Sequence, residues 1–393
     1  MSENKTNTFE PVAVSRLTEY DEDKILACLM EEADNIGIAD DAYKGKRVVI
    51  KPNLVAPTKP DGAATTNPIF LKAVVSFLRA HGAENILLAE SPGGLFTETA
   101  LRLNYKTCGI LDAAASCDLP LSYDTSSKNV NAKNAKACRA FSVITPISQA
   151  DVIVDLCRLK SHSLTKMSAA VKNFFGVVPG IQKFEMHSAY PTLPVFAEML
   201  VDLADMLCRR HEILAICDGI VGMEGNGPTG GDPRKIGAVL MSQDPFCLDL
   251  AAETIVGFEN TVSTTNAAKA RGLCPSSVKD LDIRGTDPRE IALLDFREPD
   301  ATRKTFLGSL STLFGGKLAD FFAPHPLVNK KKCMGCGVCQ NSCPRRAIDM
   351  IEHAGKKRAA IRHADCIRCF CCQELCPIHV IDIRQNPITK LLH

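Results

Sequence analysis

The sequence lacks any long apolar run and any excess of charge of one sign. Its 393 residues hold 46 Lys and Arg against 45 Asp and Glu, so charge gives no signal for nucleic acid or a membrane surface. No apolar run reaches the roughly 18 residues of a spanning helix. The first residues, MSENKTNTFEPVAV, have no apolar stretch after a basic one, which argues against a secretory signal. We expect a soluble, cytoplasmic protein with no membrane span and no nucleic-acid partner.

Cysteine, in contrast, is abundant. Nine of the 18 cysteines are scattered over the first 300 residues, and nine lie between Cys333 and Cys376. A large chain without an export signal makes little use of disulfides. We interpret the scattered cysteines as small buried apolar residues and the concentrated ones as metal ligands.

The concentrated cysteines form one motif twice, C-x2-C-x2-C-x3-C-P, at an offset of 33 residues. The flanking Ala347-Ile348-Asp349 recurs as Val380-Ile381-Asp382, which indicates an internal duplication. The sequence CIRCFCCQELCP of the second copy resembles the bacterial two-cluster ferredoxins, and this resemblance implies electron transfer. The eight repeated cysteines are Cys333, Cys336, Cys339 and Cys343, followed by Cys366, Cys369, Cys372 and Cys376.

Thiolates are soft ligands that suit iron–sulfur clusters, and in this motif the fourth cysteine ligates the other cluster. The motif therefore predicts two [4Fe–4S] clusters. One is held by Cys333, Cys336, Cys339 and Cys376, and the other by Cys366, Cys369, Cys372 and Cys343. Cys371 breaks the repeated spacing and is predicted to be no ligand. The alternative is a pair of zinc sites, which more commonly use two separated pairs of ligands.

The first 300 residues alternate short β-branched runs with helical patterns, which predicts an α/β domain with a parallel sheet, in one or two subdomains. Asn67 and Pro68 are the expected cap and first turn of a helix. Expected strands are 47–51, 86–90, 151–156, 213–217 and 237–241. Expected helices are 68–81, 97 onward, 166–175 and 249–256.

We divide the chain into an α/β domain (1–300), an amphipathic helical connector (301–328) and a small α+β ferredoxin-like domain (329–393). The last region has 12 Lys and Arg against 5 Asp and Glu, while residues 1–328 have 34 against 40. Basic residues there either offset the negative charge of the clusters or form a docking face for an acidic redox partner.

Four upstream motifs resemble those of a known family. They are KPNLV (51–55), LKSHSLTKMSAAVKNFFG (159–176), DGIVGMEGNGPTGG (218–231) and DPFCLDLAA (244–252). The family is the domain of unknown function 362, whose members are described as iron–sulfur cluster-binding proteins. The resemblance covers roughly residues 10–385, and it implies cluster binding without assigning a catalytic residue.

Polar residues follow several predicted strands, and the carboxyl ends of parallel strands share one edge of a sheet. We therefore expect one cleft there, although each residue could instead be a cap or a solvated side chain. The candidates for binding an anionic small molecule are Lys51, Asn53, Thr65, Thr66, Lys160, His162, Lys172 and Asn173. Lys51, Lys160 and His162 are the catalytic candidates, His162 as a general acid or base or as a structural residue.

A glycine-rich segment, 218–231, is expected to cover the same edge, with Asp218 at its base and Glu224 and Asn226 within it. It has no P-loop Lys-Ser/Thr ending and no G-x-G-x-x-G that opens a helix. Asp218 or Glu224 is expected to offset the charge of the lysines. With Asp244 and Asp249 they could also bind Mg²⁺, whereas a surface turn and a helix cap are the simpler alternatives.

Three functions fit these features. The leading hypothesis is an oxidoreductase of anaerobic type that passes low-potential electrons through two clusters to an anionic small molecule in the α/β domain. The second is a non-enzymatic electron carrier or a docked subunit of a larger redox complex. The third is an ATP- or metal-dependent enzyme whose clusters sense redox state or hold structure.

Overall fold

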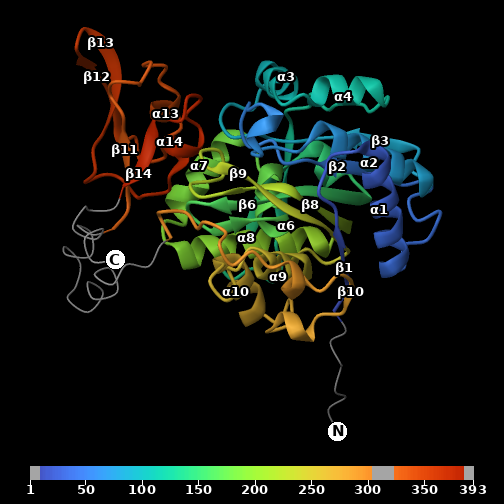
Figure 1. Cartoon of the computed structure of the whole chain (residues 1–393). Coiled ribbons are helices and arrows are strands. Elements are labelled where there is room, and N and C mark those ends of the chain that lie inside the picture. Colours follow the sequence, from blue (N-terminus) through green and yellow to red (C-terminus); the bar gives the residue numbers. More distant parts are fainter. Residues whose placement is uncertain (1–8, 303–322, 385–393) are drawn as a thin grey trace.

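The computed structural model describes residues 9–302 and 323–384 (Figure 1). An eight-stranded sheet forms the centre of the α/β domain, in the order β10-β1-β9-β8-β6-β2-β3, with β7 paired to β6. The strands are β1 (Val12–Arg16), β2 (Arg47–Lys51), β3 (Asn85–Leu88), β6 (Val152–His162), β7 (Lys166–Ser168), β8 (Glu212–Glu224), β9 (Asp232–Ser242) and β10 (Ile283–Gly285).

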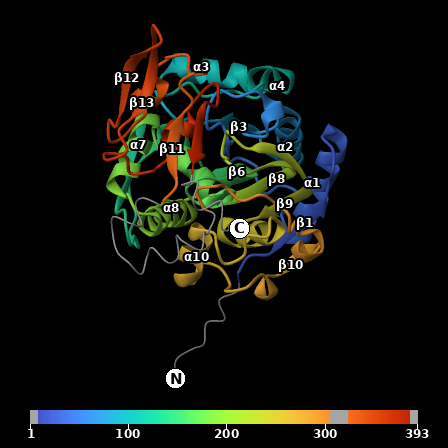
Figure 2. The same ribbon diagram turned by 60° about the vertical axis from the view of Figure 1, so that its left-hand side comes forward.

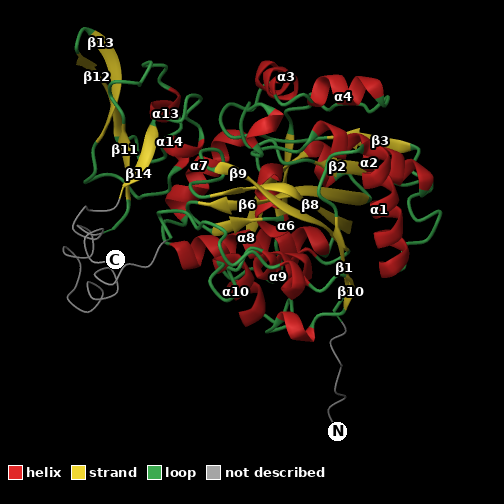
Figure 3. Ribbon diagram, in the orientation of Figure 1, coloured by secondary structure: helices red, strands yellow, loops and turns green. Residues whose placement is uncertain are grey.

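The predicted α/β class is confirmed, and the sheet is mostly parallel. Strands β8, β6, β2 and β3 run parallel to one another, whereas β9 is antiparallel to both of its neighbours and β7 folds back on β6. The four parallel strands bring their carboxyl ends to one edge, as Figure 3 lets the reader follow. A ligand site is expected at such an edge.

Helices cover both faces of the sheet. Alternate residues of β2 and β6 point to opposite faces, so Val48 and Val154 belong to one apolar cluster, and Val49 and Ile153 to the other. The first face carries α1 (Glu22–Ile36), α2 (Pro68–Ala80), α3 (Glu98–Thr107) and α4 (Ile110–Ser116). The second carries α8 (Leu193–Cys208), α9 (Pro245–Ile255) and α10 (Ser263–Ala270).

Shorter elements complete the domain. A hairpin of β4 (Ser127–Asn131) and β5 (Ala140–Ile144) precedes α5 (Thr145–Ser148), and α6 (Ala170–Asn173) and α7 (Gly180–Ala189) follow β7. The 3₁₀ turns are η1 (Pro60–Gly62), η2 (Phe174–Val177), η3 (Val278–Asp280) and η4 (Pro288–Ile291). No helix in the described part of the chain is long and apolar enough to cross a membrane.

Local signals predicted some boundaries well and missed others. Asn67 caps α2, since its Oδ1 accepts from Ile69 N at 2.8 Å. The helix expected at 166–175 is wrong over its first part, which is strand β7. The glycine-rich loop is also shorter than predicted, because β8 continues to Glu224 in a hairpin with β9. Only residues 225–231 connect the two strands.

The C-terminal module repeats its own structure. Helix α13 (Val338–Asn341) and helix α14 (Cys371–Glu374) are related by the 33-residue offset of the sequence repeat. Strand β11 (His325–Val328) pairs with β14 (Ile381–Arg384), and β12 (Ile348–His353) pairs with β13 (Lys356–Ile361). Through β11, residues 325–328 of the predicted connector take part in the strand pairing of this module. The middle of the predicted connector lies outside the described residues.

The module sits against the edge of the sheet where the parallel strands end, beside α7 (Figures 1 and 2). Two hydrogen bonds join α14 to the turn between β8 and β9. Thr229 Oγ1 donates to Glu374 O at 2.7 Å, and Gln373 Nε2 donates to Asn226 O at 2.9 Å. The glycine-rich turn therefore docks the module onto the α/β domain.

Candidate functional site

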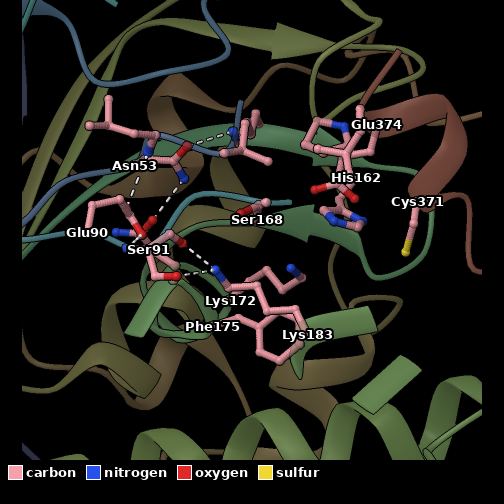
Figure 4. Close-up of a pocket in the computed structure, with 18 of the residues that line it drawn as sticks. Asn53, Glu90, Ser91, His162, Ser168, Lys172, Phe175, Lys183, Cys371 and Glu374 are labelled. Carbon is pink, nitrogen blue, oxygen red and sulfur yellow. Dashed lines mark hydrogen bonds between the residues drawn. The ribbon is translucent and has the colours of Figure 1, made fainter. Parts of the chain in front are cut away.

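A cavity of about 70 Å³ lies where the ends of β2 and β6 meet α14 (Figure 4). Such a volume holds several waters or one small anion. Lining side chains come from both domains, with Cys371, Glu374 and Leu375 supplied by the module. From the α/β domain come Asn53, Glu90, Ser91, Lys160, His162, Ser168, Lys172, Asn173, Phe175, Lys183 and His187. We call this space the charged cavity.

Lys51 lies one layer behind the charged cavity, at the end of β2. Its side chain is 1% exposed, and its Nζ donates to Glu90 Oε2 at 2.8 Å and to Asn173 Oδ1 at 3.2 Å. Gly176 passes over this pair so closely that a Cβ there would lie 2.2 Å from Glu90 Oε1. Lys51, which was predicted to be catalytic, is thus a buried partner of Glu90 and does not line the charged cavity.

Lys160 and Asn53 face each other across the strand ends. Lys160 Nζ donates to Asn53 Oδ1 at 2.8 Å and to Ala64 O at 2.6 Å, and Asn53 Nδ2 donates to Asn173 Oδ1 at 2.9 Å. Burial lowers the pKa of Lys160 to about 7. This lysine therefore changes its protonation near neutral pH, which is the property of a proton donor.

Two further lysines reach the charged cavity from helices. Lys183 on α7 donates to Ser91 O and, at 3.2 Å, to Pro92 O, and burial lowers its pKa to about 7. Lys172 on α6 has its Nζ 5.0 Å from the centre of the Phe175 ring. Burial also lowers the pKa of Lys172. An anion bound between these lysines would stabilise their charged forms.

His162 is held in one tautomer by its own loop. Its Nδ1 accepts from Leu164 N at 3.1 Å and from Thr165 N at 3.4 Å, so the ring proton is on Nε2. Burial lowers the pKa of His162 well below its usual range. Nε2 is buried and has no hydrogen-bond partner among the described residues. His162 is therefore built to donate a hydrogen bond, and the predicted role of general base does not fit this tautomer.

The carboxylates of the charged cavity are Glu90 and Glu374, and the expectation that Asp218 or Glu224 would supply them is wrong. Asp218 accepts from Tyr20 Oη at 2.9 Å and lies 3.5 Å from Arg158 Nη1. Glu224 pairs with Arg297 at 2.8 Å. Both side chains are directed away by the long β8–β9 hairpin, whose register the sequence did not reveal.

The remaining predicted binding residues lie close to the charged cavity without lining it. Thr66 Oγ1 accepts from Asn53 N at 2.8 Å, and Thr65 O accepts from Arg158 Nη1 at 2.6 Å. Asn226 Nδ2 donates to Asp300 at 2.9 Å. These residues hold the surrounding loops in place, and their roles are structural.

The predicted Mg²⁺ site has no support. Asp244 caps α9 by accepting from Phe246 N at 2.8 Å. Asp249 does not cap its own helix but accepts from Ala170 N at 2.7 Å, which fixes the start of α6. In residues 9–302 and 323–384, no three His, Cys, Asp or Glu side chains converge on a point where one metal ion would bind.

The repeated cysteines instead surround two separate cavities in the module. One is lined by Cys333, Cys336, Cys339 and Cys376. The other is lined by Cys343, Cys366, Cys369 and Cys372, together with Cys371. Apolar side chains such as Ile348 and Ile381 enclose them. Four soft thiol donors around each cavity fit a [4Fe–4S] cluster in each.

Several residues of the charged cavity were missed from the sequence. Three of them lie outside the motifs quoted above, namely Ser91, Lys183 and His187. Glu374 lies within the cysteine motif, whose spacing predicts only the thiol ligands. Glu90 ends the run ILLAE, and a carboxylate directly after a buried strand was the one available signal. His187 stacks on Phe196 at 4.4 Å, and burial lowers its pKa to about 3.

Fold and site together define an iron–sulfur protein, in which an α/β domain with a charged cavity is joined to an electron-transfer module. The chain belongs to the family described as Domain of unknown function (DUF362), whose model matches residues 48–254. A model described as a 4Fe-4S dicluster domain matches residues 326–383. Both agree with the resemblances seen in the sequence.

A thylakoid-associated protein of Synechocystis sp. is 30% identical over 315 residues, which cover 75% of this chain and 93% of that protein. Two solved structures are more distant. The lactate racemase apoprotein from Thermoanaerobacterium thermosaccharolyticum has a TM-score of 0.39 at 12% identity, over 63% of this chain and 57% of its own. A Thermotoga maritima protein has a TM-score of 0.38 at 12% identity, over 64% and 60%. Less than two thirds of either structure is therefore covered.

Proposed function

We propose that this protein is an iron–sulfur oxidoreductase that reduces a small anionic molecule in the charged cavity. One observation carries the proposal. Cys371 lines the charged cavity and also the cavity edged by Cys343, Cys366, Cys369 and Cys372. The thiol-lined cavity therefore lies directly behind one wall of the charged one, and an electron has only that wall to cross.

The two sets of four cysteines would hold the two clusters, each of which passes one electron at a time when bound. Reduction of a C=C or C=O bond consumes two electrons and two protons. The electrons would come from a low-potential redox protein. The sequence has no nicotinamide or flavin fingerprint that would suggest another source.

The chain's own residues would position the anion and supply a proton. Lys160, Lys172 and Lys183 outnumber the carboxylates that face the charged cavity, since Glu90 is already paired with Lys51. The Nε2–H of His162 has no hydrogen-bond partner in the described part of the chain and could donate to a bound oxygen. Lys160, with a pKa near 7, can give up a proton and regain it from solvent.

The test is anaerobic turnover by full-length, cluster-loaded protein with reduced methyl viologen as electron donor. Small 2-oxo acids and 2-enoates are offered as acceptors, and viologen oxidation is recorded. We expect Lys172→Met to lower kcat/KM at least about tenfold, the effect of losing one charge-assisted contact. Lys128→Met, on the exposed strand β4, is the matched control. A protein with full iron content that oxidises viologen with no member of the panel would favour the docked electron carrier.

A further inference from the structure

A second, larger cavity adjoins the charged one along the seam between the two domains. It has a volume of about 310 Å³ and is lined mostly by carbon. Helices α3 and α7 form one wall, and α13 and α14 form the other. We call it the apolar groove, and its chief side chains are Leu95, Leu103, Ile181, Phe184, Val338 and Leu375.

The two cavities share one wall. Gly93, Phe184, Glu374 and Leu375 line both of them. In this wall a Cβ on Gly93 would lie 2.9 Å from Leu375 Cδ2 and 3.1 Å from Val55 O, so the backbone at Gly93 packs directly against Leu375 of the module. Glycine at this position lets the two domains approach closely between the charged cavity and the apolar groove.

The groove also leaves apolar side chains in water without a partner in the described chain. Leu95 is 64% exposed, Leu103 57% and Ile181 49%. Scattered exposed leucines are ordinary, but a set that converges on one groove marks a binding surface. A ligand in the groove would cover all three.

We infer that the apolar groove is a second subsite for the same substrate, which is an amphipathic carboxylic acid. Its carboxylate lies among the lysines of the charged cavity, and its aliphatic or aromatic chain crosses the shared wall beside Phe184 and Glu374 into the groove. This inference rests on the proposed function and adds the substrate class. The wall shared with the charged cavity favours a substrate chain over a docked protein, because a docked protein would cover the leucines without reaching the lysines.

Isothermal titration of full-length, cluster-loaded protein with acetate, butanoate, hexanoate and octanoate tests the inference under anaerobic conditions. We expect the affinity to rise about fourfold for each methylene buried in the groove. Leu103→Glu should abolish this rise and leave acetate binding unchanged. Leu294→Glu, at a residue 92% exposed and outside the groove, should keep it. Ile181→Glu replaces Leu103→Glu if thermal melting shows that variant to be unfolded.

The outcomes separate this inference from the function on which it rests. If acetate binds and octanoate binds no more tightly, the groove is no substrate subsite, and the anion cavity stands. A rise with chain length that survives both groove variants also overturns the inference. If acetate does not bind at all, the proposed function fails instead, and with it the assignment of a carboxylate head.

Discussion

The thiol-lined cavities of the module and the charged cavity of the α/β domain differ in the sequence separation of the residues that line them. All eight repeated cysteines fall between Cys333 and Cys376, within two short loops. The charged cavity takes residues from Asn53 to Leu375. Ligand spacing in the sequence is enough to predict the thiol-lined cavities. The charged cavity, in contrast, forms only when the strands have assembled into the sheet. Sequence motifs are therefore a far better guide to the module than to the α/β domain.

Removing single thiols should have the largest effect and tests the module side of this comparison. We expect Cys372→Ser to lose one cluster, so that iron falls from about eight to about four atoms per chain. Cys371→Ser should keep both, because Cys371 lies outside the repeated spacing. Iron and acid-labile sulfide analysis of anaerobically purified protein measures this. Equal losses in the two variants would show that the ligand register is wrong.

Breaking the buried ion pair between Lys51 and Glu90 should have the next largest effect, and it tests the α/β domain. Lys51→Met leaves the buried Glu90 unpaired, so we expect a loss of about 3–5 kcal/mol in the free energy of unfolding. The sequence contains no Trp, so far-UV circular dichroism in urea is the measurement.

Lys46→Met is the matched control for Lys51→Met, because Lys46 pairs with Glu212 at the surface. Such a pair contributes about 0–1 kcal/mol. The double variant Lys51→Met with Glu90→Gln should recover much of the lost stability. Equal losses in the free energy of unfolding for the Lys46 and Lys51 variants would contradict the proposal that burial makes the Lys51–Glu90 pair important for stability.

The sequence predicted the fold class, the repeated cysteines and several strand starts, because each depends on spacing or on local capping. The start of α2 was predictable because the side chain of Asn67 caps backbone N–H groups within the next three residues and Pro68 occupies the first turn. The region 166–175 was misread because its structure depends on Asp249, about 80 residues away, which accepts from Ala170 N. A distant partner of this kind leaves no mark on local periodicity.

The candidate site follows the same division. Six residues were expected in one cleft because parallel strands share an edge. The structure places five of them around the charged cavity, whereas Lys51 lies behind it; the five are Asn53, Lys160, His162, Lys172 and Asn173. Asp218 could not be placed, because its direction depends on the bulge where the β8–β9 register shifts. Glu374 could not be found at all, since only the docking of α14 brings it to the cavity. Sequence motifs do not predict contacts between the two domains.

Crowding the floor of the charged cavity should have a smaller effect. A methyl group at Gly176 would lie 2.2 Å from Glu90 Oε1 and 2.6 Å from Lys51 Nζ, so the buried pair must shift. We expect Gly176→Ala to cost about 1–3 kcal/mol in urea unfolding. Gly62→Ala, where a Cβ meets nothing within 4 Å, should change stability by less than about 0.5 kcal/mol. A neutral Gly176→Ala would mean that the pair is looser than the structure has it.

The smallest expected effect is the pH dependence of anion binding, which separates the buried lysines from an exposed lysine at the surface. Burial lowers the pKa of Lys160 and of Lys183 to about 7, and it raises the pKa of Asp155, behind the cavity, to about 7. As the pH rises through 7, the two lysines lose positive charge and Asp155 gains negative charge. Each change weakens the attraction for an anion, so the signs agree.

We therefore expect acetate affinity to fall between pH 6 and pH 8, by up to about tenfold over the whole interval for each group that takes up a proton on binding. Titration calorimetry in buffers of different ionisation enthalpy gives both the affinity and the number of protons. Lys160→Met and Lys183→Met should each flatten the profile, whereas Lys128→Met at the surface should not. An affinity that rises with pH would mean that acetate meets no protonated lysine, and binding would then depend on neutral donors such as the Nε2–H of His162.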